Sequence, residues 1–229
     1  MEETVDATVD VNAPDRSRWY PWYVGVVLAC AAAASGIVYS RLPAITPTHW
    51  NLNGQPDKYG SALALVASMP VVMVAIALLA RLLPVIDPLR ANYEKFLPTY
   101  RLVFAMVLTV LLAIHLTVLA LALGVAVPMD RVAPASIGLL FVLLGNVLPR
   151  ARRNWMFGIR TPWTLSSDRV WERTHRMGGY VMTGAGVIML LALLFVRGRN
   201  AMIVVPGIAI TAVAVCVIYS YAAWRQESH

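Results

Sequence analysis

Six apolar runs separated by polar intervals constrain this chain more than any other feature of its sequence. They occupy residues 24–39, 63–79, 102–127, 137–148, 180–196 and 202–221, and the fourth is short unless its helix starts near Val132. Such runs are typical of membrane-spanning helices, because hydrocarbon offers no partner to a free backbone N–H or C=O and a helix satisfies its own. The period-two alternation of a closed β-barrel does not occur. The sequence therefore predicts an all-α membrane protein, a bundle of six transmembrane helices.

The composition indicates the same class. The hydrophobic fraction is 59% and the charged fraction only 14%, against about a quarter in soluble domains. The net charge is +7, but the Lys and Arg residues stand at the ends of the apolar runs, where they set topology and contact lipid headgroups. We therefore expect membrane lipid, and not nucleic acid, as the partner of this charge. Cys30 and Cys216 lie within apolar runs and form no CxxC motif, which argues against a redox or metal role.

The distribution of Lys and Arg predicts the orientation of the chain. The amino tail carries two, the second connection four, the fourth seven and the carboxyl tail one, whereas the other three connections together carry five. By the positive-inside rule, both termini are expected in the cytoplasm. Residues 1–18 lack the basic start and apolar core of a signal peptide and are interpreted as an acidic, disordered cytoplasmic tail. Two membrane domains of three helices each should follow, 19–127 and 128–229.

The first polar interval is expected to form a compact loop on the outer face of the membrane. Pro43, Pro47 and Pro56 exclude a helix there, and Asn53-Gly54 favours a two-residue turn because both residues tolerate positive φ. The candidate ligand-binding residues of this loop are His49, Trp50, Asn51, Asn53, Gly54, Asp57 and Tyr59.

Three interpretations of the outer loop are open. His49 and Asp57 could ligate a metal, but a metal site wants at least three ligands and no second histidine lies nearby, so no metal is expected. In a structural interpretation, His49 hydrogen-bonds Asp57 and holds the turn. In a recognition interpretation, an edge that presents Asn51 and Asn53 binds an external ligand, while Trp50 lies on the membrane.

The second motif-rich interval, between the fourth and fifth runs, is expected on the cytoplasmic face. Gly158 permits a sharp bend, and Pro162 favours extended backbone at the preceding Thr161. A short helix should then run toward His175, after which Gly178-Gly179 turns the chain into the fifth span. The candidate residues for coupling to a cytoplasmic protein are Asn154, Gly158, Arg160, Thr161, Pro162, Trp163, Trp171 and His175.

Several side chains of this interval have two interpretations. Trp155, Trp163 and Trp171 are expected to anchor the chain at the membrane interface or, alternatively, to contact a ligand. Arg160 stands apart from the other charges and is a candidate for a fork-like contact to a carboxylate or phosphate. No Ser-His-Asp order, HExxH motif or Gly-rich phosphate loop accompanies it, so neither an enzyme nor a cofactor is expected.

His115 is the one ionisable residue deep within an apolar run. Ionisable groups inside a membrane are costly and often functional. For a single histidine, a neutral imidazole that is hydrogen-bonded to a neighbouring Ser, Thr or carbonyl is the favoured explanation, and both interpretations are carried forward.

The two polar intervals together resemble the SdpI family of bacterial membrane proteins, which has an amino-terminal domain of unknown function. The resemblance rests on P-x-x-T-P-x-H-W-N-x-N-G-x-x-D-x-Y-G-S at 43–61, on N-x-x-x-G-I-R-T-P-W-T-L at 154–165, and on W-x-x-T-H at 171–175. The motifs occur in the family's order, with membrane spans between them. One departure is Ala62, where relatives often carry Lys.

This resemblance implies a multi-pass protein of the bacterial inner membrane that gives resistance to an exported antimicrobial peptide. It also implies signal transduction, in which a peptide toxin binds on the outer face and a cytoplasmic repressor is recruited on the inner face. A different hypothesis is a small-molecule or ion transporter, or a membrane-embedded enzyme, that uses both loops and His115. That hypothesis requires Asp57, His115 and Arg160 to surround one continuous cavity.

Overall fold

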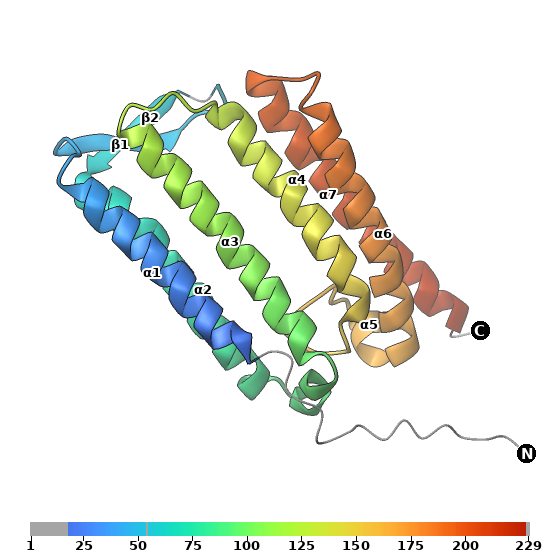
Figure 1. The fold of residues 1–229 in the computed structure, drawn as a ribbon. Coiled ribbons are helices and arrows are strands. Elements are labelled where there is room, and N and C mark those ends of the chain that lie inside the picture. Colours follow the sequence, from blue (N-terminus) through green and yellow to red (C-terminus); the bar gives the residue numbers. More distant parts are fainter. Residues whose placement is uncertain (1–17, 54, 228–229) are drawn as a thin grey trace, which may run out of the picture.

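The computed structural model describes residues 18–53 and 55–227 of the chain. In this part, long helices of at least 19 residues run alternately in opposite directions (Figure 1). They are α1 (Trp19–Tyr39), α2 (Ala62–Ile86), α3 (Leu97–Ala122), α4 (Met129–Val147), α6 (Asp168–Ala192) and α7 (Gly198–Glu227). The shorter elements are strands β1 (Ile45–Trp50) and β2 (Pro56–Ser61), 3-10 helices η1 (Arg90–Lys95) and η2 (Leu148–Arg150), and helix α5 (Pro162–Ser166).

Five of the long helices are apolar and long enough to cross a membrane: α1, α2, α3, α7 and the segment Met129–Arg150, which joins α4 to η2. Helix α6 differs because charged residues crowd its first nine positions, from Asp168 to Arg176. The span expected at 180–196 begins in its second half and extends four residues past its end at Ala192, and it stays a prediction.

Several helix ends differ from the predicted spans. Helix α2 continues to Ile86, seven residues beyond the apolar run, and α3 ends at Ala122, five residues before the predicted end. Hydropathy marks the part of a helix that suits hydrocarbon, whereas the helix itself continues until a cap or a glycine stops it. After α3, Gly124 adopts a φ of 85°, a conformation that ends a helix.

The predicted turn at Gly178-Gly179 is wrong, because α6 runs through both residues. Gly179 and, further along the helix, Gly186 allow α6 to approach α4 closely. A Cβ added at Gly179 would lie 2.8 Å from the carbonyl oxygen of Gly145, and one at Gly186 would lie 2.6 Å from that of Gly138. Small residues that let two helix backbones meet are typical of helix packing in membranes.

The outer interval adds a β-hairpin to an otherwise helical chain. Strands β1 and β2 are antiparallel, with Ile45 opposite Ser61 and Thr46 opposite Gly60, and the register shifts after Pro47. Proline lacks the N–H that a ladder needs, which is consistent with an irregular pairing at that point. The expected turn at Asn53-Gly54 includes Gly54, which lies outside the described residues.

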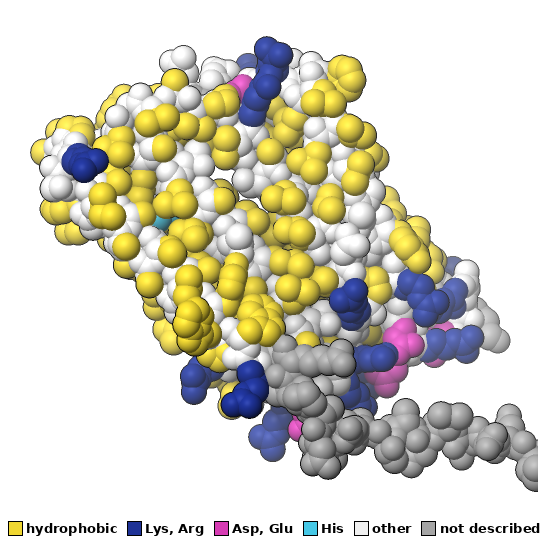
Figure 2. Space-filling model, viewed as in Figure 1, with side chains coloured by type: hydrophobic (Ala, Val, Ile, Leu, Met, Phe, Trp, Pro, Cys, Tyr) yellow, Lys and Arg dark blue, Asp and Glu magenta, His cyan; other side chains and the backbone are white. Residues whose placement is uncertain are grey.

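The hairpin and α5 lie at opposite ends of the bundle (Figure 1). Helix α1 begins, and α7 ends, at the end that holds α5. On the face in Figure 2, hydrophobic side chains cover the middle, whereas Lys and Arg side chains gather mainly at the α5 end. This distribution suits a protein whose middle is surrounded by hydrocarbon.

The buried core is divided along the bundle. One cluster, around Met73 and Leu108, packs α1, α2 and α3 together, and another, around Met189 and Val205, lies mainly between α6 and α7. A third, of Tyr93, Phe96 and Tyr100, reaches Phe157 from the other half of the chain. The α5 end is therefore where the two halves interlock through large side chains.

Candidate functional site

The exposed end of the hairpin presents a histidine–carboxylate pair. The Nδ1 atom of His49 lies 2.5 Å from the Oδ1 atom of Asp57, and the two side chains are 57% and 37% exposed. The contact expected by the structural interpretation is therefore present, and both partners also stay accessible to a ligand. We call residues 45–61 the outer hairpin, after its predicted side of the membrane.

Asn51 holds the tip of the outer hairpin together. Its Oδ1 atom accepts hydrogen bonds from the backbone N–H of Asn53 at 2.9 Å and of Gln55 at 3.1 Å, and its own N–H donates to the Gln55 carbonyl at 2.8 Å. This is the local side-chain-to-backbone bonding that asparagine favours in turns. Asn53 and Tyr59 remain exposed, whereas Asn51 is partly engaged in shaping the tip.

The outer hairpin also lines a cavity of about 190 Å³, which it shares with the neighbouring ends of α4 and α7. Its walls are Thr48, His49, Trp50 and Asn51 from the hairpin, Met129, Asp130 and Ala133 from α4, and Met202 from α7. Trp50, which was expected to lie on the membrane, is half-buried and lines this cavity. Asp130 also accepts a hydrogen bond from the N–H of Gly198 at 2.9 Å and so ties the start of α7 to α4.

At the other end, the chain between η2 and α6 forms the inner loop, residues 151–167. Asn154 is part of this loop, and it is completely buried. The Asn154 Oδ1 atom accepts from the N–H groups of Met156 at 2.9 Å and Phe157 at 2.6 Å, and its Nδ2 donates to the Arg152 carbonyl at 2.8 Å. An irregular loop leaves backbone groups without ladder partners, and Asn154 supplies them.

His175 of α6 binds the backbone of the same loop and supports its shape. Its Nδ1 atom donates to the Trp171 carbonyl at 2.9 Å, its Nε2 atom accepts from the Ile159 N–H at 3.0 Å, and its ring stacks on the Trp171 indole at 3.9 Å. His175 lies in the polar first half of α6, where burial lowers its pKa to about 4. The imidazole is therefore neutral near pH 7, with one nitrogen donating and the other accepting.

Gly158 is required by this arrangement for two reasons. Its φ is 106°, in the region that L side chains rarely adopt. In addition, a Cβ at this position would lie 2.3 Å from Nε2 of His175. The bend expected at Gly158 is confirmed, and the structure adds that His175 occupies the space where a side chain would stand.

The start of α5 is fixed by two threonines. The Thr161 N–H donates to Thr164 Oγ1 at 2.8 Å, and the Thr164 N–H donates to Thr161 Oγ1 at 3.3 Å, which together form a capping box. Pro162 occupies the first helical position, where its missing N–H costs nothing. The usual pattern has Glu or Gln as the second member, so the sequence did not indicate this box.

The three tryptophans have different environments. Trp155 is 49% exposed. Trp163 donates from its indole to Ser220 Oγ at 2.6 Å and packs against α7. Trp171 is buried and donates to the Ala151 carbonyl at 2.9 Å. Interfacial anchoring is therefore wrong for Trp171, whose indole is needed inside the fold.

Arg160 lies exposed on the inner loop, and its Nη1 atom donates to the Trp155 carbonyl at 2.6 Å. Two other arginines of the interval bind carboxylates of α6: Arg152 pairs with Glu172 at 2.5 Å and Arg153 with Asp168 at 2.7 Å. Within residues 18–53 and 55–227, no carboxylate pairs with Arg160, and its fork-like contact to a carboxylate or phosphate of a ligand stays a prediction. Arg160 and Trp155 thus form an exposed surface of the inner loop.

Both motif segments match known families. Residues 150–220 match the SdpI/YfhL protein family, and residues 26–74 match a domain of unknown function, DUF1648. The chain is 25% identical over 199 residues to Immunity protein SdpI of Bacillus subtilis (strain 168), an alignment that covers 86% of this chain and 93% of that protein. The chain is thus similar to the SdpI family, through its carboxyl-terminal segment and through a relative aligned along most of its length. With its five apolar helices and this similarity, the chain is a multi-pass protein of the bacterial plasma membrane. No solved structure matches it.

Asp87 and its partner Tyr93 were not singled out from the sequence. Asp87, at the end of α2, is buried and accepts from the N–H of Leu89 at 2.7 Å, the hydroxyl of Tyr93 at 3.0 Å and the N–H of Trp155 at 2.8 Å. Burial and the hydrogen bond to Asp87 raise the pKa of Tyr93. Asp87 directly follows the apolar residues 82–86, and this position is the one sign in the sequence that its carboxylate could be buried. Its partner Trp155 is 68 residues away and could not be inferred locally.

His115 of α3 is buried in a contact between helices. Its Nε2 atom lies 2.9 Å from Ser35 Oγ, and Ser35 donates to the Val66 carbonyl at 2.8 Å. The neighbouring serine expected by the structural interpretation is therefore present. Asp57 in β2 and Arg160 before α5 lie at opposite ends of the bundle (Figure 1). The transporter or enzyme hypothesis requires these three residues to surround one cavity. This arrangement does not favour such a cavity.

Within the described residues, no group of three or more His, Cys, Asp or Glu side chains gathers where it could hold a metal ion. The His49–Asp57 pair of the outer hairpin therefore lacks a third protein ligand there, and a metal site normally needs three or four.

Proposed function

We propose that this protein is an integral membrane immunity protein that gives resistance to an exported antimicrobial peptide. The observation that carries the proposal is the placement of two motif segments at opposite ends of an apolar bundle, one of them an exposed hairpin. The similarity to Immunity protein SdpI along most of both chains supports the same role. The peptide would be bound by the outer hairpin and the signal passed on by the inner loop.

This proposal includes a topology of six spans with both termini in the cytoplasm. The charge count supports it, since fourteen Lys and Arg residues fall on the side of the termini and five on the other. It can be tested by accessibility labelling of Asn53→Cys and Arg169→Cys, in a background that carries Cys30→Ser and Cys216→Ala. We expect a membrane-impermeant thiol reagent to label position 53 in intact cells and position 169 only after lysis. Equal labelling of both in intact cells would refute the topology.

On the outer face, the peptide contact is assigned to His49, Asn53, Asp57 and Tyr59, whose side chains are exposed. A hydrogen-bonding pair beside an aromatic ring and above a small cavity suits a peptide that carries both polar and apolar groups. Trp50 and Asn51 support that surface from within the hairpin.

On the inner face, the contact to a cytoplasmic repressor is assigned to the exposed part of the inner loop, with Arg160 and Pro162. Asn154, Gly158, Thr161, Trp171 and His175 hold that loop in shape, and Trp163 fastens it to α7. Coupling requires that peptide binding favour one arrangement of the bundle over another, since a ligand shifts only an equilibrium between states that it binds differently.

The test is survival of peptide-sensitive cells that express the chain and are challenged with the peptide toxin. His49→Ala and Asp57→Ala should lose protection while still reaching the membrane, whereas Gln55→Ala, an exposed change in the same hairpin, should keep it. Arg160→Ala should keep protection and lose expression of a reporter under the repressor. Unchanged protection in both hairpin variants would remove the outer hairpin from the mechanism.

A further inference from the structure

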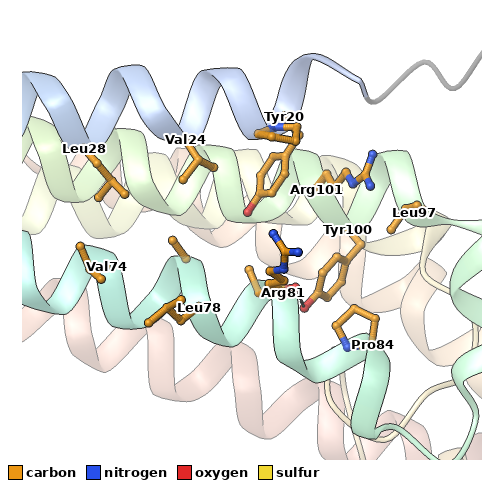
Figure 3. Close-up of a pocket in the computed structure, with 13 residues that line it drawn as sticks. Tyr20, Val24, Leu28, Val74, Leu78, Arg81, Pro84, Leu97, Tyr100 and Arg101 are labelled. Carbon is orange, nitrogen blue, oxygen red and sulfur yellow. Dashed lines mark hydrogen bonds between the residues drawn. The ribbon is translucent and has the colours of Figure 1, made fainter.

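A cavity of about 610 Å³ lies between α1, α2 and α3 near the end of the bundle that holds α5 (Figure 3). It takes no part in the proposed function. Its walls have two chemical zones: a polar one with Tyr20, Arg81 and Arg101, and an apolar one that includes Val24, Leu28, Val74, Ala77 and Leu78.

The polar zone gathers three donor groups from three helices. Tyr20 of α1 and Arg81 of α2 point into the space between those helices, and Arg101 of α3 lies at the same end (Figure 3). The Tyr20 hydroxyl is buried and has no hydrogen-bond partner among the described residues. A buried hydroxyl without a partner is unfavourable, so a ligand that supplies a hydrogen-bond acceptor would be stabilised here. The two guanidinium groups favour an anionic acceptor.

The apolar zone continues from this polar end along α1 and α2. It is open at the side, since Leu78 is 62% exposed on a helix apolar enough to cross a membrane. A hydrocarbon chain could therefore enter from the bilayer without passing through water.

We propose that this cavity binds an anionic glycerophospholipid. Its phosphate lies between Arg81, Arg101 and the Tyr20 hydroxyl, and one acyl chain lies along Val24 and Leu78. Free phosphate would satisfy only the polar zone and leave the apolar walls uncovered. A zwitterionic lipid such as phosphatidylcholine fills the apolar zone but brings an ammonium group of its own close to the two arginines.

Two other cavities lack this combination. The one of about 620 Å³ between η1 and α6 is lined by charges of both signs, including Glu94, Lys95 and Glu172, so it has little preference for an anion. The groove of about 710 Å³ between α6 and α7 is lined almost entirely by apolar side chains, and nothing there selects a headgroup.

The experiment compares lipid retention by the full-length protein in detergent, measured by native mass spectrometry. The wild type is incubated with phosphatidylglycerol or with phosphatidylcholine. We expect preferential retention of phosphatidylglycerol, and a reduction of about fivefold in Arg81→Gln. Arg81→Lys should keep most of the retention. Arg90→Gln, an exposed arginine at the same end but outside the cavity, is the matched control and should retain phosphatidylglycerol like the wild type.

A second pair of measurements separates the two zones and covers a failure of Arg81→Gln to fold. Tyr20→Phe keeps the ring and removes the hydroxyl, and should also lower phosphatidylglycerol retention. Val24→Trp fills the apolar zone and should lower it without changing the charge. Equal retention of the two lipids by the wild type, or full retention by both Arg81→Gln and Tyr20→Phe, would overturn the proposal. So would thermal stabilisation by inorganic phosphate alone as large as that by phosphatidylglycerol.

Discussion

The outer hairpin and the inner loop are similarly rich in polar and aromatic residues, but the protein uses these side chains in opposite ways. In the outer hairpin, His49 and Asp57 bind each other and stay exposed. At the inner loop, Asn154 of the loop and His175 of the adjoining α6 are buried and bind the backbone of the loop. Motif residues in one protein can therefore serve recognition at one end and the shape of the backbone at the other.

The difference has a physical origin in how each segment satisfies its backbone. Two antiparallel strands pair their own N–H and C=O groups, so the hairpin can present its side chains to a ligand. The inner loop has no ladder, and it is pressed against η1 and the start of α6, where water cannot supply partners. Side chains must do so instead, which leaves fewer of them available for contact.

The largest effect should come from Gly158→Ala. The substitution forces a side chain into a positive φ and against Nε2 of His175, and we expect it to lower the free energy of unfolding by about 2–5 kcal/mol. Thermal unfolding in detergent measures the loss. Gly184→Ala in α6, where an added Cβ meets nothing within 4 Å, is the control and should not destabilise. Equal stability of the two variants would show that the inner loop adapts.

The second prediction compares asparagines at the two ends. Asn154→Leu leaves the N–H groups of Met156 and Phe157 without their acceptor, and should cost about 2–4 kcal/mol of unfolding free energy. Asn53→Leu, in the exposed hairpin, should change it by less than about 0.5 kcal/mol. Chemical denaturation of both variants measures the difference, and similar losses would contradict the contrast between the segments.

The third prediction concerns pH. The unfolded His175 takes up a proton near pH 6.5, whereas the folded one does so only near pH 4, so the unfolded state binds more protons between these values. Stability is therefore complete above about pH 6.5 and should fall as the pH drops toward 4, by up to about 3 kcal/mol. His175→Asn should lose this part of the pH dependence. A variant with the wild-type profile would show that another group is responsible.

The smallest effect on stability should come from the outer hairpin. Both members of the His49–Asp57 pair are more than a third exposed, and exposed pairs contribute about 0–1 kcal/mol. Asp57→Asn should therefore leave the unfolding temperature almost unchanged while it lowers protection against the peptide. A large loss of stability would place Asp57 with the inner-loop residues, as a part of the fold.

Much of the inner loop was located correctly from its residues, but the sequence did not show which of them are buried. The bend at Gly158 and the start of the helix that carries His175 follow from local backbone preferences, and both are confirmed. The helix is not short as expected, because it runs on to Ala192. Coupling to a partner was predicted for Trp171 and His175, yet both side chains face the interior. A motif shows that a side chain is needed at a position, and burial decides whether a ligand or the backbone needs it.

The sequence by itself determined the helical membrane class and the two polar segments, because the cost of placing backbone and charge in hydrocarbon depends on local composition. The tertiary structure alone decided which polar groups meet. Asp87 reaches Trp155 across 68 residues, and Tyr20, Arg81 and Arg101 share one cavity from three helices. Such encounters depend on how each helix is rotated and how closely it packs, and a local pattern does not contain that information.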